Sequence, residues 1–145
     1  MKKILMSLSL LMLVPAVFIL TGCFGITDGA FSVRGVKLDS LSTVMGETQT
    51  VERAGSGAHD LNGRYQYRLY TFENNTDRDA ARSAYVLYLQ QQEYPLGPIG
   101  AGIQLLDGTI IGLSWMKPVG TNYAFVGIDD KTENKLWIVL DVRTS

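Results

Sequence analysis

The sequence predicts an α+β domain in which one main helix packs on an antiparallel, largely meander β-sheet. Three observations support this prediction. The stretch 77–92 has amphipathic helical spacing, residues from 103 onward alternate as strands do, and Asp107-Gly108 lies between two apolar runs as hairpin turns do. The 145 residues show no repeat of fixed period and suffice for one hydrophobic core. We therefore expect a single globular domain over 31–145.

The first expected elements are short. Between residues 33 and 45, the apolar residues Leu38, Leu41, Val44 and Met45 follow helical spacing. Asp39 or Ser40 is a suitable N-cap for this helix, and Gly46 is a suitable end. The glycine-rich segment 55–63 is predicted as an exposed loop, and the tyrosine-rich run 64–72 after it as a strand.

The central helix over 77–92 has the clearest pattern. Thr76 or Asp77 can cap it, and alanines and tyrosines from residue 80 onward gather on one side of a helical projection. Tyr94-Pro95 ends the helix, and Gly97-Pro98 turns the chain toward the strands. Small alanines beside large tyrosines indicate close packing of this helix on a sheet.

The C-terminal part is predicted as a four-stranded meander. Residues 103–106 and 109–115 flank Asp107-Gly108, which favours a two-residue type I′ turn. Residues 123–128 and 136–142 flank a polar loop and form the last two strands. Their alternation places one aliphatic set on the side that meets the helix: Ala124, Val126, Ile128, Leu136, Ile138, Leu140 and Val142.

The other side of these strands carries aromatic residues among charged ones. Tyr123, Phe125 and Trp137 share this side, and Trp115 joins them in the assumed register. Aromatic residues on a half-polar sheet face are typical of a partner-binding surface. The alternative is that N-terminal segments fold over this face and bury it.

The N-terminus has the pattern of an export signal. Lys2 and Lys3 precede an apolar run from Ile4 to Leu20, and Leu20-Thr21-Gly22-Cys23 ends the run with the only cysteine. This arrangement resembles the lipobox of bacterial lipoproteins. The resemblance implies that residues 1–22 are a signal peptide and that Cys23 carries a diacylglycerol and a further acyl chain. A retained membrane-spanning anchor and a simple secretory peptide are the alternatives.

Residues 23–30 would then form the lipidated cysteine and a short tether of roughly 25 Å at full extension. Lipoprotein sorting, by resemblance, uses an aspartate after the cysteine to retain proteins at the inner membrane of Gram-negative bacteria. Phe24 occupies this position here. The expected location is therefore the periplasmic side of the outer membrane, with the bilayer as one partner and another envelope protein as the second.

Composition argues against nucleic-acid binding, disulfides and most metal sites. The leader contains two of the 13 basic residues and none of the 14 acidic ones, so the mature chain is net acidic and has no basic stripe for nucleic acid. With Cys23 acylated, no disulfide is available. Zinc would need ligands beyond one histidine. Calcium at the acidic loop 129–134 is an alternative without the spacing of an EF-hand, and no cofactor is expected.

The histidine also fails to make a convincing catalytic set. His59 lies beside Asp60 and close to Ser56 in the same glycine-rich segment. Three residues so close in sequence have no evident route to triad geometry, in which the base reaches the nucleophile and is oriented by a third group. We expect no enzyme activity and regard His59 and Asp60 as an alternative loop site for binding a partner.

A second resemblance covers about a quarter of the chain. Gly35, the apolar positions from Leu38 to Met45, Gly46 and the segment 65–67 are similar to the opening of small SmpA/OmlA-type outer-membrane assembly lipoproteins. In that family, a short helix ending near a glycine precedes an aromatic strand. The helix 77–92 and the long strand-rich end depart from the family pattern. The resemblance implies a noncatalytic partner of envelope proteins and carries over no binding residue.

Three function classes follow. The first is a membrane-anchored, noncatalytic protein-interaction module. The second is an inhibitor or immunity lipoprotein that inserts the loop around His59 into an envelope hydrolase. The third is a small-ligand carrier with a pocket lined by tyrosines, namely Tyr65, Tyr67, Tyr85 and Tyr88.

Overall fold

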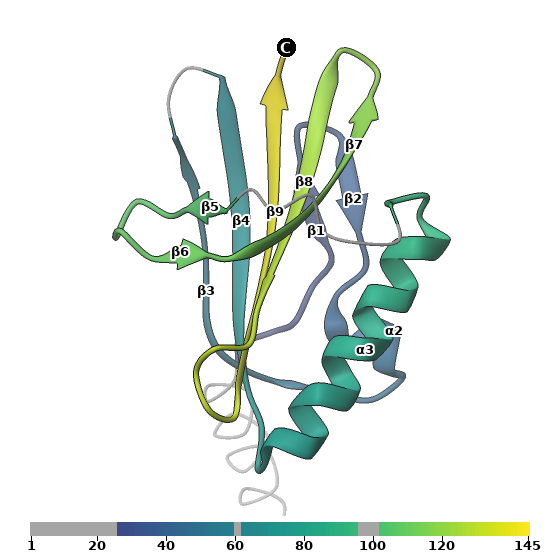
Figure 1. Cartoon of the computed structure of the whole chain (residues 1–145), viewed down its shortest axis with the longest axis vertical. Coiled ribbons are helices and arrows are strands. Elements are labelled where there is room, and N and C mark those ends of the chain that lie inside the picture. Colours follow the sequence, from purple (N-terminus) through teal and green to yellow (C-terminus); the bar gives the residue numbers. More distant parts are fainter. Residues whose placement is uncertain (1–25, 60–61, 96–101) are drawn as a thin grey trace, which may run out of the picture.

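A computed structural model describes residues 26–59, 62–95 and 102–145, and it confirms the α+β class (Figure 1). In these residues a five-stranded antiparallel sheet has the order β3-β4-β9-β8-β7, and two small hairpins, β1-β2 and β5-β6, accompany it. The strands and helices, in chain order, are β1 (Phe31–Val33), β2 (Val36–Leu38), α2 (Leu41–Met45), β3 (Thr50–Ala58), β4 (Gly63–Thr71), α3 (Asn75–Gln91), β5 (Ile103–Gln104), β6 (Ile110–Ile111), β7 (Leu113–Val119), β8 (Asn122–Asp129) and β9 (Lys135–Thr144).

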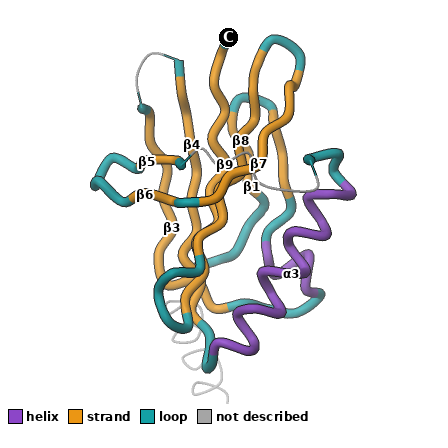
Figure 2. The backbone as a smooth tube through the Cα atoms, viewed as in Figure 1, coloured by secondary structure: helices purple, strands orange, loops and turns teal. Residues whose placement is uncertain are grey.

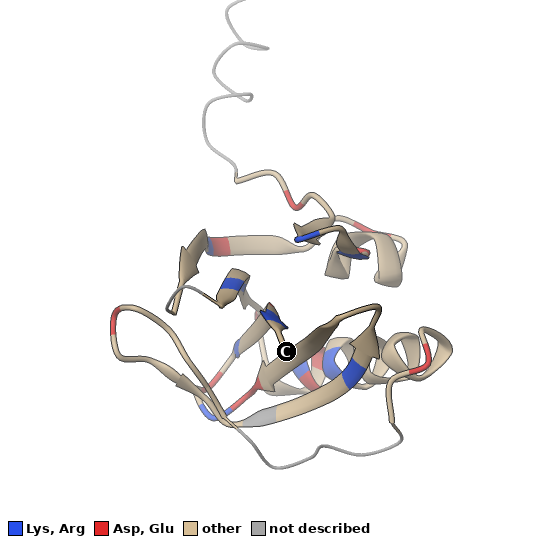
Figure 3. Cartoon of the chain, turned by 90° about the horizontal axis from the view of Figure 1, so that it is seen from above, with Lys and Arg blue, Asp and Glu red and all other residues tan. Residues whose placement is uncertain are grey.

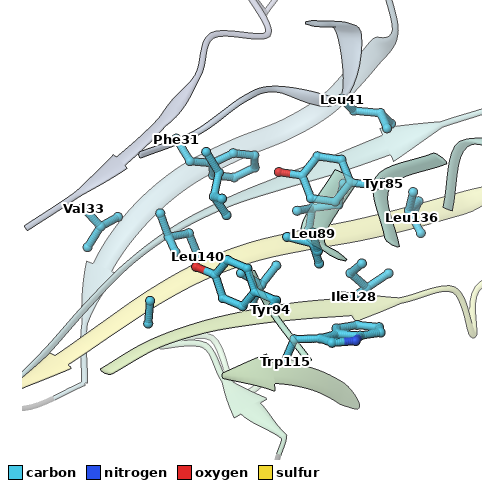
Figure 4. Close-up of a cluster of buried hydrophobic side chains, with 14 of the residues drawn as sticks. Phe31, Val33, Leu41, Tyr85, Leu89, Tyr94, Trp115, Ile128, Leu136 and Leu140 are labelled. Carbon is cyan, nitrogen blue, oxygen red and sulfur yellow. The ribbon is translucent and has the colours of Figure 1, made fainter. Parts of the chain in front are cut away.

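Helix α3 covers one side of the sheet, which we call the helix face. Asn74 caps the helix by accepting a 2.8 Å hydrogen bond from the Asp77 N–H, so α3 begins before the predicted cap at Thr76 or Asp77. Its residues at four-residue spacing, Ala81, Tyr85 and Leu89, are buried against the sheet. The predicted aliphatic set of β8 and β9 lies in the same cluster, as expected (Figure 4).

Trp115 also belongs to the helix face, so its predicted place on the aromatic face was wrong. In the β7–β8 register, Trp115 lies opposite Val126, and directly opposed residues share a face. Its side chain is buried near Tyr94 and Ile128 (Figure 4). The prediction assumed one continuous strand from 109 to 115, whereas Gly112 separates β6 from β7 and changes the phase.

The N-terminal part contains a hairpin that the pattern did not predict. Strands β1 and β2 have three residues each and join through Arg34-Gly35, both at positive φ (48° and 78°) as a type I′ turn requires. Phe31 and Val33 bury their side chains on the helix face beside β4. The short helix α2 follows as predicted. Ser40 caps it, and Gly46 ends it in the left-handed conformation.

Residues 26–30 are part of the domain rather than a free tether. The buried Asp28 carboxylate accepts hydrogen bonds from the Ser42 N–H (2.9 Å), the Ser42 hydroxyl (2.7 Å) and the Tyr70 hydroxyl (2.7 Å). Burial, and then this bond to Asp28, raise the pKa of Tyr70. The globular part therefore begins by Asp28, before the predicted boundary at residue 31. Residues 1–22 and Cys23 lie outside the described residues.

The predicted loop 55–63 is mostly strand. Strand β3 continues through Ala58, and its glycines lie under tyrosine rings of β4. A Cβ on Gly55 would lie 2.8 Å from the Tyr67 ring, and one on Gly57 would lie 2.5 Å from the Tyr65 hydroxyl oxygen. The glycines therefore permit close packing inside a strand instead of marking a loop. Strand β4 itself confirms the predicted strand 64–72 within one residue at each end.

The Asp107-Gly108 hairpin forms, but as a separate element. Leu105 pairs with Thr109 through a 2.8 Å hydrogen bond and Gly108 has φ 89°, so the loop has three residues instead of the predicted two. Hairpin β5-β6 crosses the side of the sheet opposite α3, which we call the hairpin face (Figures 1 and 2). The meander is thus three-stranded, β7-β8-β9. The predicted Gly97-Pro98 turn falls outside the described residues.

Within the described residues, neither helix combines the length and hydropathy needed to cross a bilayer.

Candidate functional site

A buried carboxylate organises one end of the hairpin face. Asp141 of β9 is fully buried, and its Oδ2 atom accepts hydrogen bonds from Arg143 Nε at 2.9 Å and lies 2.8 Å from Arg143 Nη2. His59, just after β3, places its Nε2 atom 3.1 Å from the same oxygen. These residues meet because alternate residues of β9 face this side and the His59 N–H pairs with the Gly63 carbonyl at the start of β4.

Aromatic rings surround this polar group. The His59 ring lies 4.9 Å from the Tyr65 ring, and the Arg143 guanidinium lies 5.0 Å from the Phe125 ring centroid. Tyr123 lies opposite Arg143 in the β8–β9 register and is 40% exposed. Both are partly open to solvent. The contact of a planar guanidinium with an aromatic ring is energetically favourable, and it also limits the conformations of the Arg143 side chain.

The tip of hairpin β5-β6 completes the surface. The Leu106 N–H donates a 2.9 Å hydrogen bond to the Tyr65 hydroxyl, and the Leu106 side chain is exposed. We call this group of residues, in which Tyr65 and Asp141 are buried and the others are at least partly exposed, the distal patch. It comprises His59, Tyr65, Leu106, Tyr123, Phe125, Asp141 and Arg143.

The electrostatics of the distal patch depend on Asp141. Its Oδ2 atom has two partners, while its buried Oδ1 atom has no hydrogen-bond partner among the described residues. A buried carboxylate is expensive unless it is paired, so Arg143 neutralises a charge that the sheet would otherwise hold at a cost of several kcal/mol. Arg143 nevertheless keeps 42% of its side chain exposed, and it can form hydrogen bonds outward.

The predicted aromatic surface forms only in part. Tyr123 and Phe125 lie on the distal patch, but Trp137 is buried at 9% exposure beneath hairpin β5-β6. The Arg53 guanidinium lies 5.6 Å from the Trp137 ring and forms an ion pair with Asp107 at 3.3 Å, which closes the hairpin over it. The expectation of an exposed Trp137 and Trp115 was therefore wrong. Hairpin β5-β6 covers the first, and the β7 register turns the second to the helix face.

The alternative loop site is reorganised as well. His59 contacts Asp141, 82 residues away, rather than extending from a free loop, and Asp60 lies outside the described residues. Ser56 pairs with Gln66 on the helix face, so a Ser56-His59 catalytic pair does not form. The His59 ring instead lies within hydrogen-bonding distance of the Asp141 carboxylate.

Other predicted sites are separated or engaged elsewhere. Tyr65 and Tyr67 lie on the hairpin face, whereas Tyr85 and Tyr88 belong to α3, so the tyrosine-lined pocket is not formed. In the acidic loop, Asp129 accepts hydrogen bonds from the Gly112 and Lys131 N–H groups at 3.0 Å. The described ranges contain no group of three His, Cys, Asp or Glu side chains that could hold a metal ion.

Sequence reasoning missed Asp141 and Arg143 as members of a site. Their signal was present: an aspartate inside the aliphatic run of β9 is unusual, since aspartate is depleted in strands and rarely buried without a partner. The partner His59 could not be assigned without the register that joins β3 to β4 and β4 to β9.

Comparison of the chain with protein-family profiles, with curated proteins and with solved structures finds no significant match.

Proposed function

We propose that this chain is a lipid-anchored bacterial envelope protein, held by acylated Cys23 on the periplasmic side of the outer membrane, that binds another envelope protein without catalysing a reaction. The observation that carries the proposal is the distal patch: an arginine and aromatic rings, partly exposed, on a surface fixed by hydrogen bonds. Tyrosine and arginine dominate the energetic centres of protein interfaces.

The position of Asp28 supports this arrangement. Asp28 is five positions after Cys23, and this length of chain reaches at most about 18 Å. Asp28 contacts Tyr70, which pairs with Leu136 at the start of β9, whereas the distal patch contains Arg143 near the strand's end. Arg143 is seven residues after Leu136 along β9, so the two positions lie about 23 Å apart along the strand. An anchor at Cys23 would hold the Tyr70 end toward the bilayer and leave the distal patch accessible from the periplasm.

The patch is also suited to binding by its rigidity. Arg143 is held by Asp141 and stacked on Phe125, and Tyr65 is fixed by the Leu106 N–H. Ordering a long side chain on binding costs about 0.5–1.5 kcal/mol, and a side chain already held in place loses less. A partner that offers a carboxylate to Arg143 and an apolar group to Tyr123 would match both features.

Site-specific photocrosslinking in intact cells tests the proposal. A photoreactive residue at Tyr123 should give one dominant protein adduct, while the same residue at Leu87, an exposed apolar position on α3, should give none. Arg143→Ala should remove the adduct at Tyr123. Adducts of equal yield at both positions, or none at either, would refute the distal patch as the binding surface.

An inhibitor or immunity function is the second candidate. It is favoured by the position of His59 directly after β3, at the end of the sheet, where its side chain is bonded to Asp141 and keeps 19% of its surface exposed. Under that function the protein crosslinked at Tyr123 should be an exported hydrolase. Addition of the purified lipoprotein domain should then abolish the activity of that hydrolase. Loss of inhibition in His59→Ala, with unchanged folding, would support this candidate over a structural partner.

A further inference from the structure

Strand β3 forms an open edge of the main sheet and pairs only with β4 among the described strands. The His59 N–H bonds to the Gly63 carbonyl, so these two residues form a hydrogen-bonded pair of the antiparallel ladder. Because hydrogen-bonded and non-hydrogen-bonded pairs alternate, Gly57 and Gly55 also direct their backbone groups toward β4. The backbone N–H and C=O groups of the alternate residues Ala54, Ser56 and Ala58 therefore point outward, to the side where a further strand would lie.

This segment lacks the features by which proteins usually protect an open edge, namely proline, charged side chains and bulges. The opposite edge, β7, contains Pro118, which cannot donate to a neighbouring strand. The first part of β3 has a register irregularity between Val51 and Arg53. From Ala54 to Ala58 there is no charge, no proline and no irregularity. These five residues are therefore an open template for strand pairing.

The sequence of the open segment is palindromic. Residues 54–58 read Ala-Gly-Ser-Gly-Ala in both directions. When two copies of a strand pair antiparallel about a two-fold axis, the contacts of one copy are repeated by the other. An axis at Ser56 would place Ser56 opposite itself, Gly55 opposite Gly57, and Ala54 opposite Ala58. Ser56 is also one of the outward-pointing residues, so the backbone direction and the symmetry of the sequence agree on the same axis.

Hairpin β5-β6 restricts which strand can be added at this edge. Its tip extends past β3 on the hairpin face (Figures 1 and 3). The Leu106 side chain lies 3.0 Å from the position that a Cβ on Gly57 would take, and Leu106 is 70% exposed. In a pair centred on Ser56, Gly57 faces Gly55 of the second copy on the same side of the sheet. Leu106 would thus project over a residue without a side chain, whereas a strand with a large side chain there would displace the hairpin tip.

The helix face of the seam fits a second copy as well. The side chains that meet there are those of Ala54, Ser56 and Ala58, which are small and uncharged. The two Ser56 hydroxyl groups would face each other, and serine pairs of this kind form cross-strand hydrogen bonds. Pairing of these five residues therefore brings no like charges together and buries no large polar side chain.

We propose that Ala54–Ala58 is a self-association surface, through which two copies of this chain join their sheets edge to edge about a two-fold axis at Ser56. Each outward-pointing residue exchanges two backbone hydrogen bonds with the residue that faces it. The pairing requires neither the lipid anchor nor a partner at the distal patch. Because the axis reverses the strand direction, the Tyr70 ends of the two copies point in opposite directions. Two anchors can then enter one bilayer only when the strands lie along it, so the pair is a state distinct from the upright monomer.

Two double variants of matched size test the pairing on the full-length chain in detergent micelles. Ala54→Lys/Ala58→Lys places each lysine opposite a lysine of the second copy, whereas Ala54→Glu/Ala58→Lys places each lysine opposite a glutamate. Sedimentation equilibrium should show a concentration-dependent dimer for the wild type. The dissociation constant should be at least about tenfold higher for the lysine–lysine variant and within about threefold of the wild type for the glutamate–lysine variant. The mature chain is net acidic, so added lysines cannot weaken the dimer through net charge.

Cysteine crosslinking locates the axis. Facing residues of a hydrogen-bonded antiparallel pair have Cα atoms about 5.5 Å apart, which suits a disulfide. Ser56→Cys should therefore crosslink two copies on oxidation. Thr50→Cys is the matched control and should not crosslink, because Thr50 is also exposed on β3 but lies about 20 Å along the strand from the axis. The wild-type chain reports any crosslinking through Cys23.

Three outcomes would overturn the proposal. The first is a wild-type chain that stays monomeric up to about 1 mM. The second is equal association of the two double variants. The third is crosslinking of Ser56→Cys that is no more efficient than that of Thr50→Cys. Photocrosslinking at Tyr123 reports the distal patch separately, so failure of one surface is distinguishable from failure of the other.

Discussion

The hydrogen bonds of Asp28 should make a segment before the first strand essential for stability. Asp28→Ala removes the acceptor of the Ser42 N–H, the Ser42 hydroxyl and the Tyr70 hydroxyl, at a site where the carboxylate is 3% exposed. Hydrogen bonds to a charged group contribute about 1.5–3 kcal/mol each, and the loss of one member of a buried charged group costs about 3–5 kcal/mol. We expect Asp28→Ala to lower the free energy of unfolding by about 3–5 kcal/mol.

Tyr70→Phe tests the same network from its other side. It removes one of the three bonds and leaves the carboxylate paired with Ser42, so we expect a loss of about 1.5–3 kcal/mol. The double variant should lose less than the sum of the single losses, because both changes break the same bond. Urea unfolding followed by the fluorescence of the buried tryptophans, Trp115 and Trp137, measures all three values.

Asp79→Ala is the matched control. Asp79 is also an aspartate in an ion pair, 2.8 Å from Arg78, but its side chain is 60% exposed. Its loss should cost less than about 1 kcal/mol. If Asp28→Ala cost no more than Asp79→Ala, residues 26–30 would be a free tether, and the reasoning from the buried carboxylate would be refuted.

Three further predictions concern the anchor, the core and alkaline pH. Cys23→Ser should abolish incorporation of a fatty-acid analogue during metabolic labelling and leave the protein as a precursor; labelling of the variant at the wild-type level would contradict the anchor. Ile138→Ala should lower the free energy of unfolding by about 2–5 kcal/mol because Ile138 is fully buried, whereas Lys135→Ala should cost less than about 1 kcal/mol because it breaks only a surface pair with Glu52. Burial raises the pKa of Tyr94 from 10.0 to about 12, so stability present below pH 10 should be lost as the pH rises toward 12, and Tyr94→Phe should reduce that slope in unfolding measured at each pH.

The parts of the fold that sequence reasoning predicted are those with a sustained period or with clear capping and turn residues, as at α2 and Asp107-Gly108. Helix α3 and the aliphatic residues of β8 and β9 extend over enough residues for the alternation to identify a buried face. The hairpin β1-β2 could not be found in this way, since strands of three residues contain a single alternation. Gly55 and Gly57 misled the prediction because a glycine under an aromatic ring and a glycine in a loop look the same in sequence.

The candidate site was less predictable than the fold for a similar reason. Tyr123 and Phe125 were identified from their alternation with aliphatic residues, and they do lie on the distal patch. Placing Trp137 required knowledge that hairpin β5-β6 turns back over the sheet, and placing Trp115 required the phase change at Gly112. The pairing of His59 with Asp141 arises from contacts between residues 82 positions apart, which no local pattern encodes.

The two faces of the sheet differ greatly in the size of the hydrophobic cluster that stabilises them. Among the described residues, nineteen buried residues form the cluster on the helix face, and seven form the cluster between hairpin β5-β6 and the sheet. The smaller cluster depends on two strands of two residues each, joined to the sheet by the Tyr65–Leu106 hydrogen bond and the exposed Arg53–Asp107 pair. The hairpin should therefore open as its own cooperative unit, at a lower free energy than global unfolding. In that open state Trp137 becomes solvent-exposed while α3 stays in place, and the protein then presents to chaperones and proteases a surface that its native form keeps covered.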